Sequence, residues 1–170
     1  QDVDTSAMTV VCSLSCYTQE FLDAAGDAAN GVYVWMQVLP YEEADVNEEL
    51  AAFLEAIDDD FPAAWAVGAW ADGLFLESAV NAIVEAEGPN AITRARLLEE
   101  LSKTVEFDAN GMFGTVDFSD PLNASPCFVI TQIQDGEYVR VHPAEPGTFD
   151  CDQGNVVELT ANPDTFTPDA

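Results

Sequence analysis

Basic side chains are scarce in this chain of 170 residues. Four Lys and Arg stand against 32 Asp and Glu, none of the four precedes Arg94, and the formal net charge is −28. Nucleic acids and anionic membranes are bound through clustered cations that approach phosphates, so the composition argues against both partners. A carboxylate excess is typical of a strongly solvated surface and of salt-adapted organisms. An acidic decoy for a nucleic-acid-binding protein would concentrate its charge, whereas these carboxylates are scattered over every polar face.

Long apolar runs are also missing. Asp72 and Glu77 interrupt the best candidate for a membrane span, so we expect no direct span. The first residues, Gln1 to Asp4, have neither the basic nor the apolar region of a signal peptide. We therefore expect either a mature chain or a piece of a longer one.

Recognisable catalytic and cofactor motifs are absent as well. The single histidine, His142, follows a predicted strand and precedes Pro143, which favours a solvent-facing side chain over a catalytic triad. Neither common phosphate-binding glycine loop occurs. Residues 108–111 and 150–155 resemble calcium loops but lack the glycine that the sharp turn requires. We expect no enzyme, no cofactor and no metal site.

The four cysteines are Cys12, Cys16, Cys127 and Cys151. An even number fits two disulfides in an oxidising compartment, and four cysteines allow three pairings. We favour Cys12 with Cys16 and Cys127 with Cys151, because each pair is close in sequence. Zinc is the alternative, but the spacing lacks the short knuckle pattern and His142 lies nine residues from the nearest cysteine.

The apolar content of 48% is enough for one ordinary domain. The first third predicts a strand, a helix and a strand, at residues 9–14, 18–25 and 31–38. Thr18 can cap the helix. Residues 31–38 are apolar on both faces, as in an inner strand of a parallel sheet that is covered on both sides. This order is typical of an α/β fold.

The middle of the chain predicts helices. Residues 46–57 have an apolar face at helical spacing. Residues 61–87 are apolar over most of the circumference, with Glu77, Asn81 and Glu85 on one narrow stripe, which favours a central core helix. Its aromatic N-terminal end could also line a site. Thr93 begins a further helix whose inward side chains would be Leu97, Leu98, Leu101 and Val105.

The last third predicts antiparallel strands. A turn at Asn110-Gly111 precedes a strand at residues 112–118. Residues 127–134 and 137–141 are joined by Asp135-Gly136, which is a strong signal for a two-residue hairpin. The tail from His142 is rich in Pro and Gly, with one short apolar stretch at residues 156–159.

Six segments in this order resemble one known family. They are AGDAANGVYVW, LPYEEADVNEELAAFLEAI, AVGAWADGLFLESAVNAI, ITRARLLEEL, FDANGMFGTVDF and CFVITQIQDGEYVRV. Together they resemble the C-terminal part of the type I periplasmic solute-binding proteins of ABC importers, in the branched-chain amino acid-binding branch. The resemblance covers roughly residues 8–142 and implies an α/β fold with pieces of both lobes and a C-terminal antiparallel hairpin.

The resemblance implies a division of the 170 residues. Residues 8–38 would form a strand-helix-strand unit of the second lobe, and 39–45 a hinge crossing. Residues 46–118 would supply first-lobe helices and the return crossing. Residues 127–141 would form the second-lobe hairpin, followed by a tail at 142–170. The N-terminal half of such a protein would be missing.

The resemblance also implies a solute site. The loop Ser13, Leu14, Ser15, Cys16 and Tyr17 matches the second-lobe loop that faces the solute, and Trp65 matches an aromatic position just before the long first-lobe helix. Trp70 takes the place of a frequent tyrosine. The ligand-binding candidates are therefore Ser13, Ser15, Cys16, Tyr17, Trp65 and Trp70.

One departure from the family concerns the ligand. Amino acid-binding members carry a carboxylate in that loop for the ammonium group, and this chain has none there. Glu20 is the nearest carboxylate, and Glu20 or Asp23 could substitute. An α-amino acid ligand is therefore in doubt.

The resemblance implies an extracytoplasmic solute-binding subunit, periplasmic or lipid-anchored at the cell surface, that delivers an amino acid, amide or related solute to an ABC permease. Two alternatives remain open. One is a ligand-sensing domain of a receptor or regulator with the same fold. The other is a stand-alone acidic interaction protein.

Overall fold

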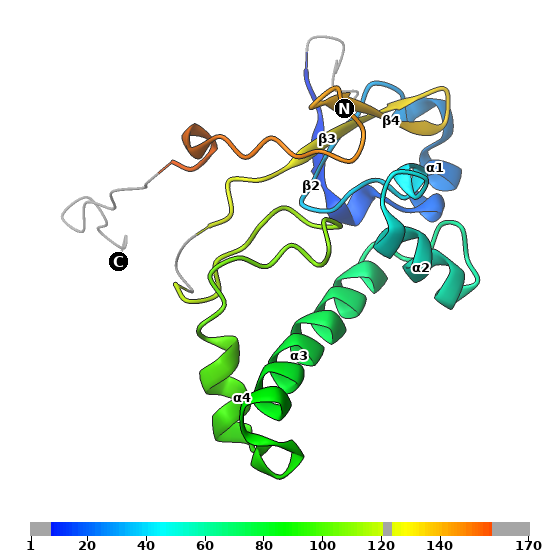
Figure 1. Cartoon of the computed structure of the whole chain (residues 1–170). Coiled ribbons are helices and arrows are strands. Elements are labelled where there is room, and N and C mark those ends of the chain that lie inside the picture. The colour runs from blue at the N-terminus through cyan, green and yellow to red at the C-terminus, as the bar shows by residue number, and fades with distance from the viewer. Residues whose placement is uncertain (1–7, 121–123, 158–170) are drawn as a thin grey trace, which may run out of the picture.

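A computed structural model describes residues 8–120 and 124–157 and shows a mixed α/β fold (Figure 1). Its sheet has the strand order β1-β2-β3-β4. The strands are β1 (Val11–Ser13), β2 (Tyr33–Met36), β3 (Val129–Gln134) and β4 (Glu137–His142). β1 and β2 are parallel, whereas β3 is antiparallel to both β2 and β4.

The predicted strand-helix-strand unit is confirmed. Helix α1 (Gln19–Ala25) connects the parallel strands β1 and β2, and the Thr18 side chain accepts a hydrogen bond from the Phe21 backbone N–H at 3.1 Å. That bond satisfies one of the unpaired N–H groups at the helix start. The helix therefore begins where the sequence places its cap.

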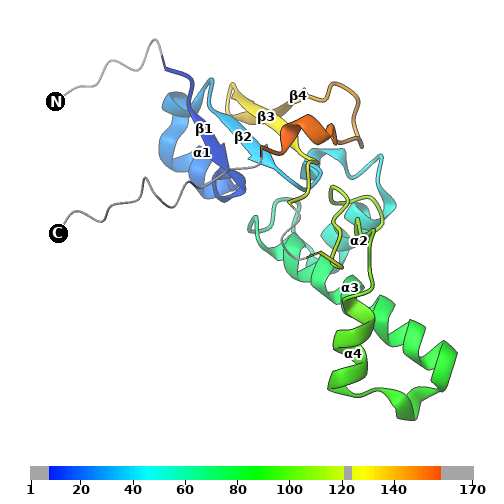
Figure 2. The same ribbon diagram turned by 90° about the vertical axis from the view of Figure 1, so that its left-hand side faces the viewer.

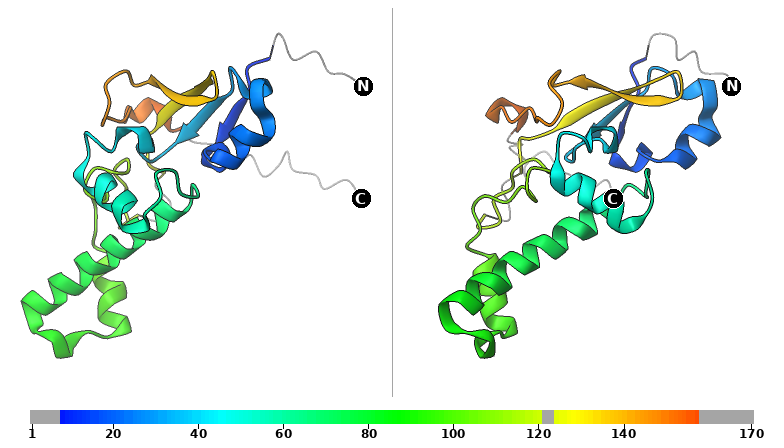
Figure 3. Two further views of the ribbon diagram at one scale, coloured as in Figure 1. Left: turned by 90° about the vertical axis from the view of Figure 1, so that its right-hand side faces the viewer. Right: turned by 45° about the vertical axis from the view of Figure 1, so that its right-hand side comes forward.

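Three longer helices form the middle of the chain: α2 (Glu48–Ile57), α3 (Ala66–Glu87) and α4 (Arg94–Leu101). Asn47 caps α2 and the predicted cap Thr93 begins α4. Helices α3 and α4 pack side by side and project away from the sheet (Figures 2 and 3). Short 3₁₀ helices connect the elements: η1 (Leu14–Cys16), η2 (Gly26–Ala29), η3 (Tyr41–Glu43), η4 (Pro89–Ala91) and η5 (Gln153–Asn155).

In the core, one face of the sheet packs against helix α2 and the first turn of helix α3. Val34 and Met36 of β2 are fully buried in one cluster with Leu50 and Phe53 of α2 and Val67 of α3. Apolar burial of this kind is the main stabilising term in folding. The sheet, helix α2 and the start of helix α3 therefore share one core.

The opposite face of the sheet is exposed, contrary to the prediction from the sequence. Residues 31–38 were expected to lie between two covered faces, but Trp35 is 38% exposed, and Val11 of the neighbouring β1 is 61% exposed. The reason is that β2 lies in a mixed sheet, and within the described residues only the Val34 and Met36 side of that strand is fully buried.

The hairpin is confirmed, but the strand predicted at residues 112–118 is wrong. Asp135 and Gly136 both have positive φ, 52° and 82°, as a type I′ turn requires. Residues 107–118 instead make single bridges, Val38 with Phe113 and Phe107 with Val116. Each bridge pairs one residue, so no continuous ladder forms there.

Helices α3 and α4, which we call the helical arm, are less buried than their sequence suggests. Leu98 of α4 and Val105 beyond it were expected to face inward, yet they are 56% and 58% exposed. Leu76 and Val84 of α3 are also exposed. By length and composition α3 is long and apolar enough to cross a membrane, despite Asp72 and Glu77, and 22% of its most apolar window is buried. The sequence alone therefore did not exclude α3 as a span.

Candidate functional site

The loop after β1 is short and held by a disulfide. Ser13 ends β1, and Ser15 lies in η1; both are exposed. Cys16 closes the loop by its disulfide to Cys12, four residues earlier. Ser13 and Ser15 thus present two hydroxyl groups, which can donate and accept hydrogen bonds, on a restrained backbone.

Tyr17, the last residue of that loop, points into the core. Its side chain is fully buried, its hydroxyl donates to Glu42 Oε2 at 2.5 Å, and the same oxygen accepts the Tyr41 backbone N–H at 2.6 Å. The sequence places Tyr17 in a surface loop beside the solute. The structure places it beneath that loop, where it connects the loop to the segment that leaves β2.

Three aromatic rings pack around the ring of Tyr17. We call the four residues, Tyr17, Tyr41, Phe61 and Tyr138, the aromatic cluster. The Tyr17 ring lies 4.6 Å from Tyr138, 4.8 Å from Phe61 and 5.1 Å from Tyr41 between ring centroids. These separations are typical of favourable edge and tilted contacts. The cluster therefore joins the β1 loop, the chain after β2, the entrance to α3 and β4.

Hydrogen bonds fix the fourth ring in place. The Tyr138 hydroxyl donates to the Cys16 carbonyl at 2.5 Å and accepts from the Thr18 N–H at 3.1 Å. Both partners are backbone groups at the end of the β1 loop. The β4 strand thus holds the loop conformation from the opposite end of the chain.

Burial alters the acidity of this cluster. It raises the pKa of Tyr17 well above the ordinary value, with the Glu42 carboxylate adding to the effect, and it raises the pKa values of Tyr41 and Tyr138. Desolvation likewise raises the pKa of Glu42, although the hydrogen bond from Tyr17 opposes that shift. The three phenols therefore remain protonated at neutral pH, and those of Tyr17 and Tyr138 serve as donors.

The two candidate tryptophans differ in environment. Trp65, which immediately precedes α3, is 68% exposed. Trp70 donates from Nε1 to Glu49 Oε1 at 2.7 Å and its ring lies 5.9 Å from that of Phe53. Trp70 therefore packs α3 against α2, whereas Trp65 is available to a ligand.

One ring contact links the two chain segments that carry the predicted site residues. The Tyr17–Phe61 ring pair joins the β1 loop to the segment that leads into α3, four residues before Trp65. Sequence analysis did not single out Glu42, Phe61 or Tyr138. Strand alternation could have placed Tyr138 on the inner face, but nothing local identifies its distant partners.

The carboxylates near the loop lie outside this cluster. Glu20 and Asp23 of α1 are exposed, and Asp23 accepts a hydrogen bond from Gln19 Nε2 at 2.9 Å. Glu42 is the carboxylate that contacts a loop residue directly. Sequence analysis offers Glu20 and Asp23 of α1 as substitutes for the loop carboxylate of the family. The structure adds Glu42, from the chain after β2, as a third carboxylate near the loop.

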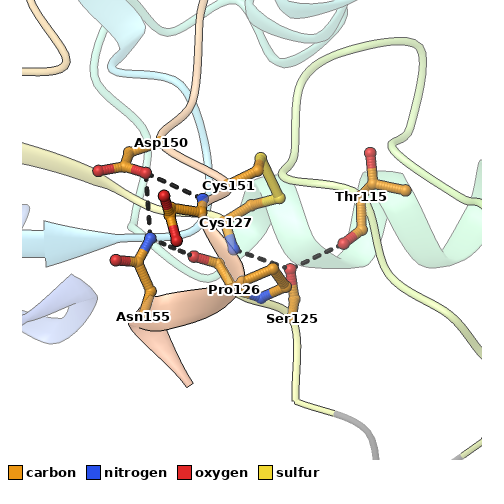
Figure 4. Close-up of a disulfide and its surroundings, with 8 residues drawn as sticks. Thr115, Ser125, Pro126, Cys127, Asp150, Cys151 and Asn155 are labelled. Carbon is orange, nitrogen blue, oxygen red and sulfur yellow. Dashed lines mark hydrogen bonds between the residues drawn. A yellow bond between two sulfur atoms is a disulfide. The ribbon is translucent and has the colours of Figure 1, made fainter. Parts of the chain in front are cut away.

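Both favoured disulfides are confirmed. Cys12 pairs with Cys16 and Cys127 with Cys151, so no cysteine remains to bind zinc. Figure 4 shows the second disulfide at the start of β3, where the Ser125 hydroxyl donates to the Thr115 carbonyl at 2.7 Å. Within residues 8–120 and 124–157, no group of three or more His, Cys, Asp or Glu could hold a metal ion.

A family model described as periplasmic binding protein matches residues 1–137. The chain belongs to the periplasmic binding protein family. This match confirms the resemblance found in the sequence and, together with the mixed sheet and its terminal hairpin, the predicted α/β fold of the type I kind. No curated protein sequence matches this chain.

A solved structure supports the same fold for this periplasmic binding protein. It is an extracellular ligand-binding receptor from Rhodopseudomonas palustris HaA2, with a TM-score of 0.57 and 17% sequence identity. The similarity covers 78% of this chain and 40% of the receptor chain. At this identity the likeness concerns the fold, and the receptor is a ligand-binding protein by its description.

Proposed function

We propose that this protein is the extracytoplasmic solute-binding subunit of an ABC importer and that it holds a small polar solute between the β1 loop and the entrance of α3. Family membership supports a ligand-binding role. The observation that supports the site is the Tyr17–Phe61 ring contact, because it links the β1 loop, which carries the exposed Ser13 and Ser15, to the segment that leads to Trp65.

The arrangement suits a small polar solute. A binding site needs an apolar wall and a few directed polar groups, and Trp65 with the two serine hydroxyls supplies both. Tyr17 and Trp70 then act behind the site, since one is buried and the other is bonded to Glu49. Amino acids, amides and related solutes are the classes to test.

The lobe assignment is part of this proposal. Residues 8–38 and the hairpin 127–141 would belong to the second lobe, and α2, α3 and α4 to the first. Residues 39–45 and the return near 114–118 would be the crossings, about which closure changes the shape that a permease reads. The Leu39 N–H donates to the Met112 carbonyl at 2.9 Å, which bonds the first crossing to the chain just before the second.

The proposed location is outside the cytoplasm. Two disulfides persist in oxidising compartments, and the family is periplasmic by description. We assign α3 to the protein rather than to a membrane, because each Asp at the centre of a spanning helix costs about 2.5–3.5 kcal/mol and α3 carries Asp72 and Glu77 within it.

Calorimetric titration of the purified protein with amino acids, amides and small carboxylates tests the proposal. We expect one class to bind and Trp65→Ala to weaken that binding at least about tenfold, as for loss of a central aromatic contact. Leu98→Ala, at an exposed position of α4, is the control for loss of an apolar side chain and should bind as the unchanged protein does. Unaltered binding by Trp65→Ala would refute the site assignment.

A ligand-sensing role is the second candidate, favoured by the receptor description of the similar structure. Sensing and transport use the same solute site but different partners. A gene for a permease and an ATPase beside this one supports transport. A kinase, cyclase or membrane segment in the same reading frame supports sensing.

A further inference from the structure

A separate cavity of about 330 Å³ lies between α1, the chain after β2 and the β3–β4 turn. The lining residues that carry its chemistry are Gln19, Glu42, Phe61, Glu137 and Tyr138. Ser13, Ser15 and Trp65 are not among its lining residues. The cavity is therefore distinct from the proposed solute site, although its volume is in the range of small-ligand pockets.

The charge of this cavity is negative. Two of its lining side chains are carboxylates, Glu42 and Glu137, and none is Lys, Arg or His. Within the described residues neither carboxylate forms an ion pair. Desolvation raises the pKa of Glu42 most, and the charges of Glu43 and then Glu137 raise it further, so Glu42 and Glu137 repel each other.

Aromatic rings form part of the wall. Phe61 and Tyr138 stack with ring centroids 5.7 Å apart and an interplanar angle of 15°. The faces of aromatic rings attract cations through their quadrupole, most strongly where water is displaced. Aromatic rings beside carboxylates that have no ion-pair partner are a combination that recognises organic ammonium groups.

We propose that this cavity binds a small organic cation, a primary ammonium that carries an apolar group and no carboxylate. The ammonium would lie between Glu42 and Glu137, and the apolar group against Phe61 and Tyr138. A carboxylate on the ligand would meet two like charges and no cation, which makes a zwitterionic amino acid a poorer ligand than the corresponding amine.

The position of Glu42 gives such binding a structural consequence. The same carboxylate accepts the hydrogen bond from Tyr17, whose hydroxyl also holds the Tyr41 N–H. A cation at Glu42 therefore contacts the connection between the β1 loop and the chain after β2.

Calorimetry with 2-phenylethylammonium tests this site, with phenylalanine as the zwitterion and 2-phenylethanol as the neutral analogue. We expect the amine to bind and both analogues to bind severalfold more weakly, because phenylalanine carries a carboxylate and 2-phenylethanol carries no cation. Glu42→Gln, which keeps an acceptor for Tyr17, and Glu137→Gln should each weaken amine binding about two- to fivefold, as for loss of one partner of an exposed ion pair. If Glu42→Gln does not fold, the exposed Glu137→Gln decides the question.

Glu85→Gln, on the exposed surface of α3, removes the same charge far from the cavity and should leave amine binding unchanged. Equal weakening by this control would mean general attraction to the acidic surface and would overturn the proposal, as would equal binding of phenylalanine or no binding of the amine. Trp65→Ala should not affect the amine. The proposed solute site can therefore fail without this one, and this one without the solute site.

Discussion

Among the few basic residues, Arg140 has an exceptional position. Its side chain is 8% exposed and pairs with the Glu43 carboxylate, and the guanidinium also donates to the carbonyls of Pro143 and Thr148 at 3.2 and 3.1 Å. Glu43 in turn accepts the Gly147 N–H at 2.8 Å. One buried ion pair thus joins η3, β4 and the loop that follows β4.

We predict that Arg140→Met destabilises the protein by about 3–5 kcal/mol, because it leaves the buried Glu43 charge unpaired. The double variant Arg140→Met/Glu43→Gln should recover part of that loss, since the remaining side chain is neutral. Urea unfolding measures both. A loss below about 1 kcal/mol for the single variant would show that the pair behaves as a surface salt bridge.

His142 and Asp150 form a hydrogen bond between His142 Nε2 and Asp150 Oδ2 at 2.6 Å. The hydrogen bond from His142 lowers the pKa of Asp150 from 3.8 to about 2, with further bonds from the Asp152 N–H and the Asn155 side chain. A lowered carboxyl pKa gives stability that is present above pH 3.8 and is lost as the pH falls through about 2.

For His142→Ala we therefore predict a pKa of Asp150 that rises toward the ordinary value, with the remaining two donors keeping part of the shift. A carbon-13 NMR titration of the Asp150 carboxyl measures it. The variant should also lose less stability than the unchanged protein between pH 4 and pH 2. An unaltered Asp150 titration would mean that His142 is not the cause of the lowered pKa.

At the scale of elements, the segment at residues 107–118 packs closely against Cys127, just before β3. A Cβ atom added at Gly114 would lie 2.3 Å from Cys127 Cβ and 3.3 Å from the Cys127 carbonyl oxygen. Backbone and disulfide atoms cannot move aside as a flexible side chain can. This segment therefore requires glycine at position 114.

We predict that Gly114→Ala destabilises the protein by about 1–3 kcal/mol through overpacking. Gly73→Ala on α3 is the matched control: nothing lies within 4 Å of the added Cβ, and alanine favours helix over glycine by about 1 kcal/mol. In thermal unfolding, the midpoint of Gly114→Ala should be lower than that of the unchanged protein, and the midpoint of Gly73→Ala should be higher. A shift of the same sign in both would contradict the packing argument.

What the sequence predicts best is local. Thr18 and Thr93 cap their helices, and Asp135-Gly136 forms the expected turn, because each depends on a few neighbouring residues. Burial was predicted less well. Leu98 is exposed although it continues an apolar pattern, because within the described residues α4 makes most of its element contacts with α3.

The site shows the same limit. The sequence indicated which loop and which aromatic residue to examine, but not that Tyr17 is buried. Its partners Glu42 and Tyr138 are 25 and 121 residues away, and no spacing rule links them. Long-range pairing of this kind becomes visible only in the folded chain.

At the scale of the molecule, apolar surface remains open on two elements. One is the sheet face that carries Val11 and Trp35. The other is the arm formed by α3 and α4, which projects from the sheet (Figure 3) and on which Leu76 and Leu98 are exposed. The similar receptor is much longer, since the match spans 40% of its chain. The described residues thus contain the loop and helix entrance of the proposed site on a framework with exposed apolar faces.

The acidic surface gives the whole molecule a strong negative field. With a net charge of −28, exposed carboxylates repel one another, and only Arg96 and Lys103 form exposed Arg or Lys ion pairs within residues 8–120 and 124–157. Salt screens such repulsion over distances of about 8–10 Å at physiological ionic strength. Binding measurements on this protein are therefore best compared at one fixed salt concentration.

Hydrogen exchange with and without the solute found by calorimetry tests the central claim most directly. The account predicts that the solute slows exchange in two separate segments together, the β1 loop at residues 13–17 and the entrance to α3 at residues 61–66. Helix α4 serves as the internal control, and its exchange should not change. Protection of α4 alone, or of neither segment, would contradict a site built from the β1 loop and Trp65.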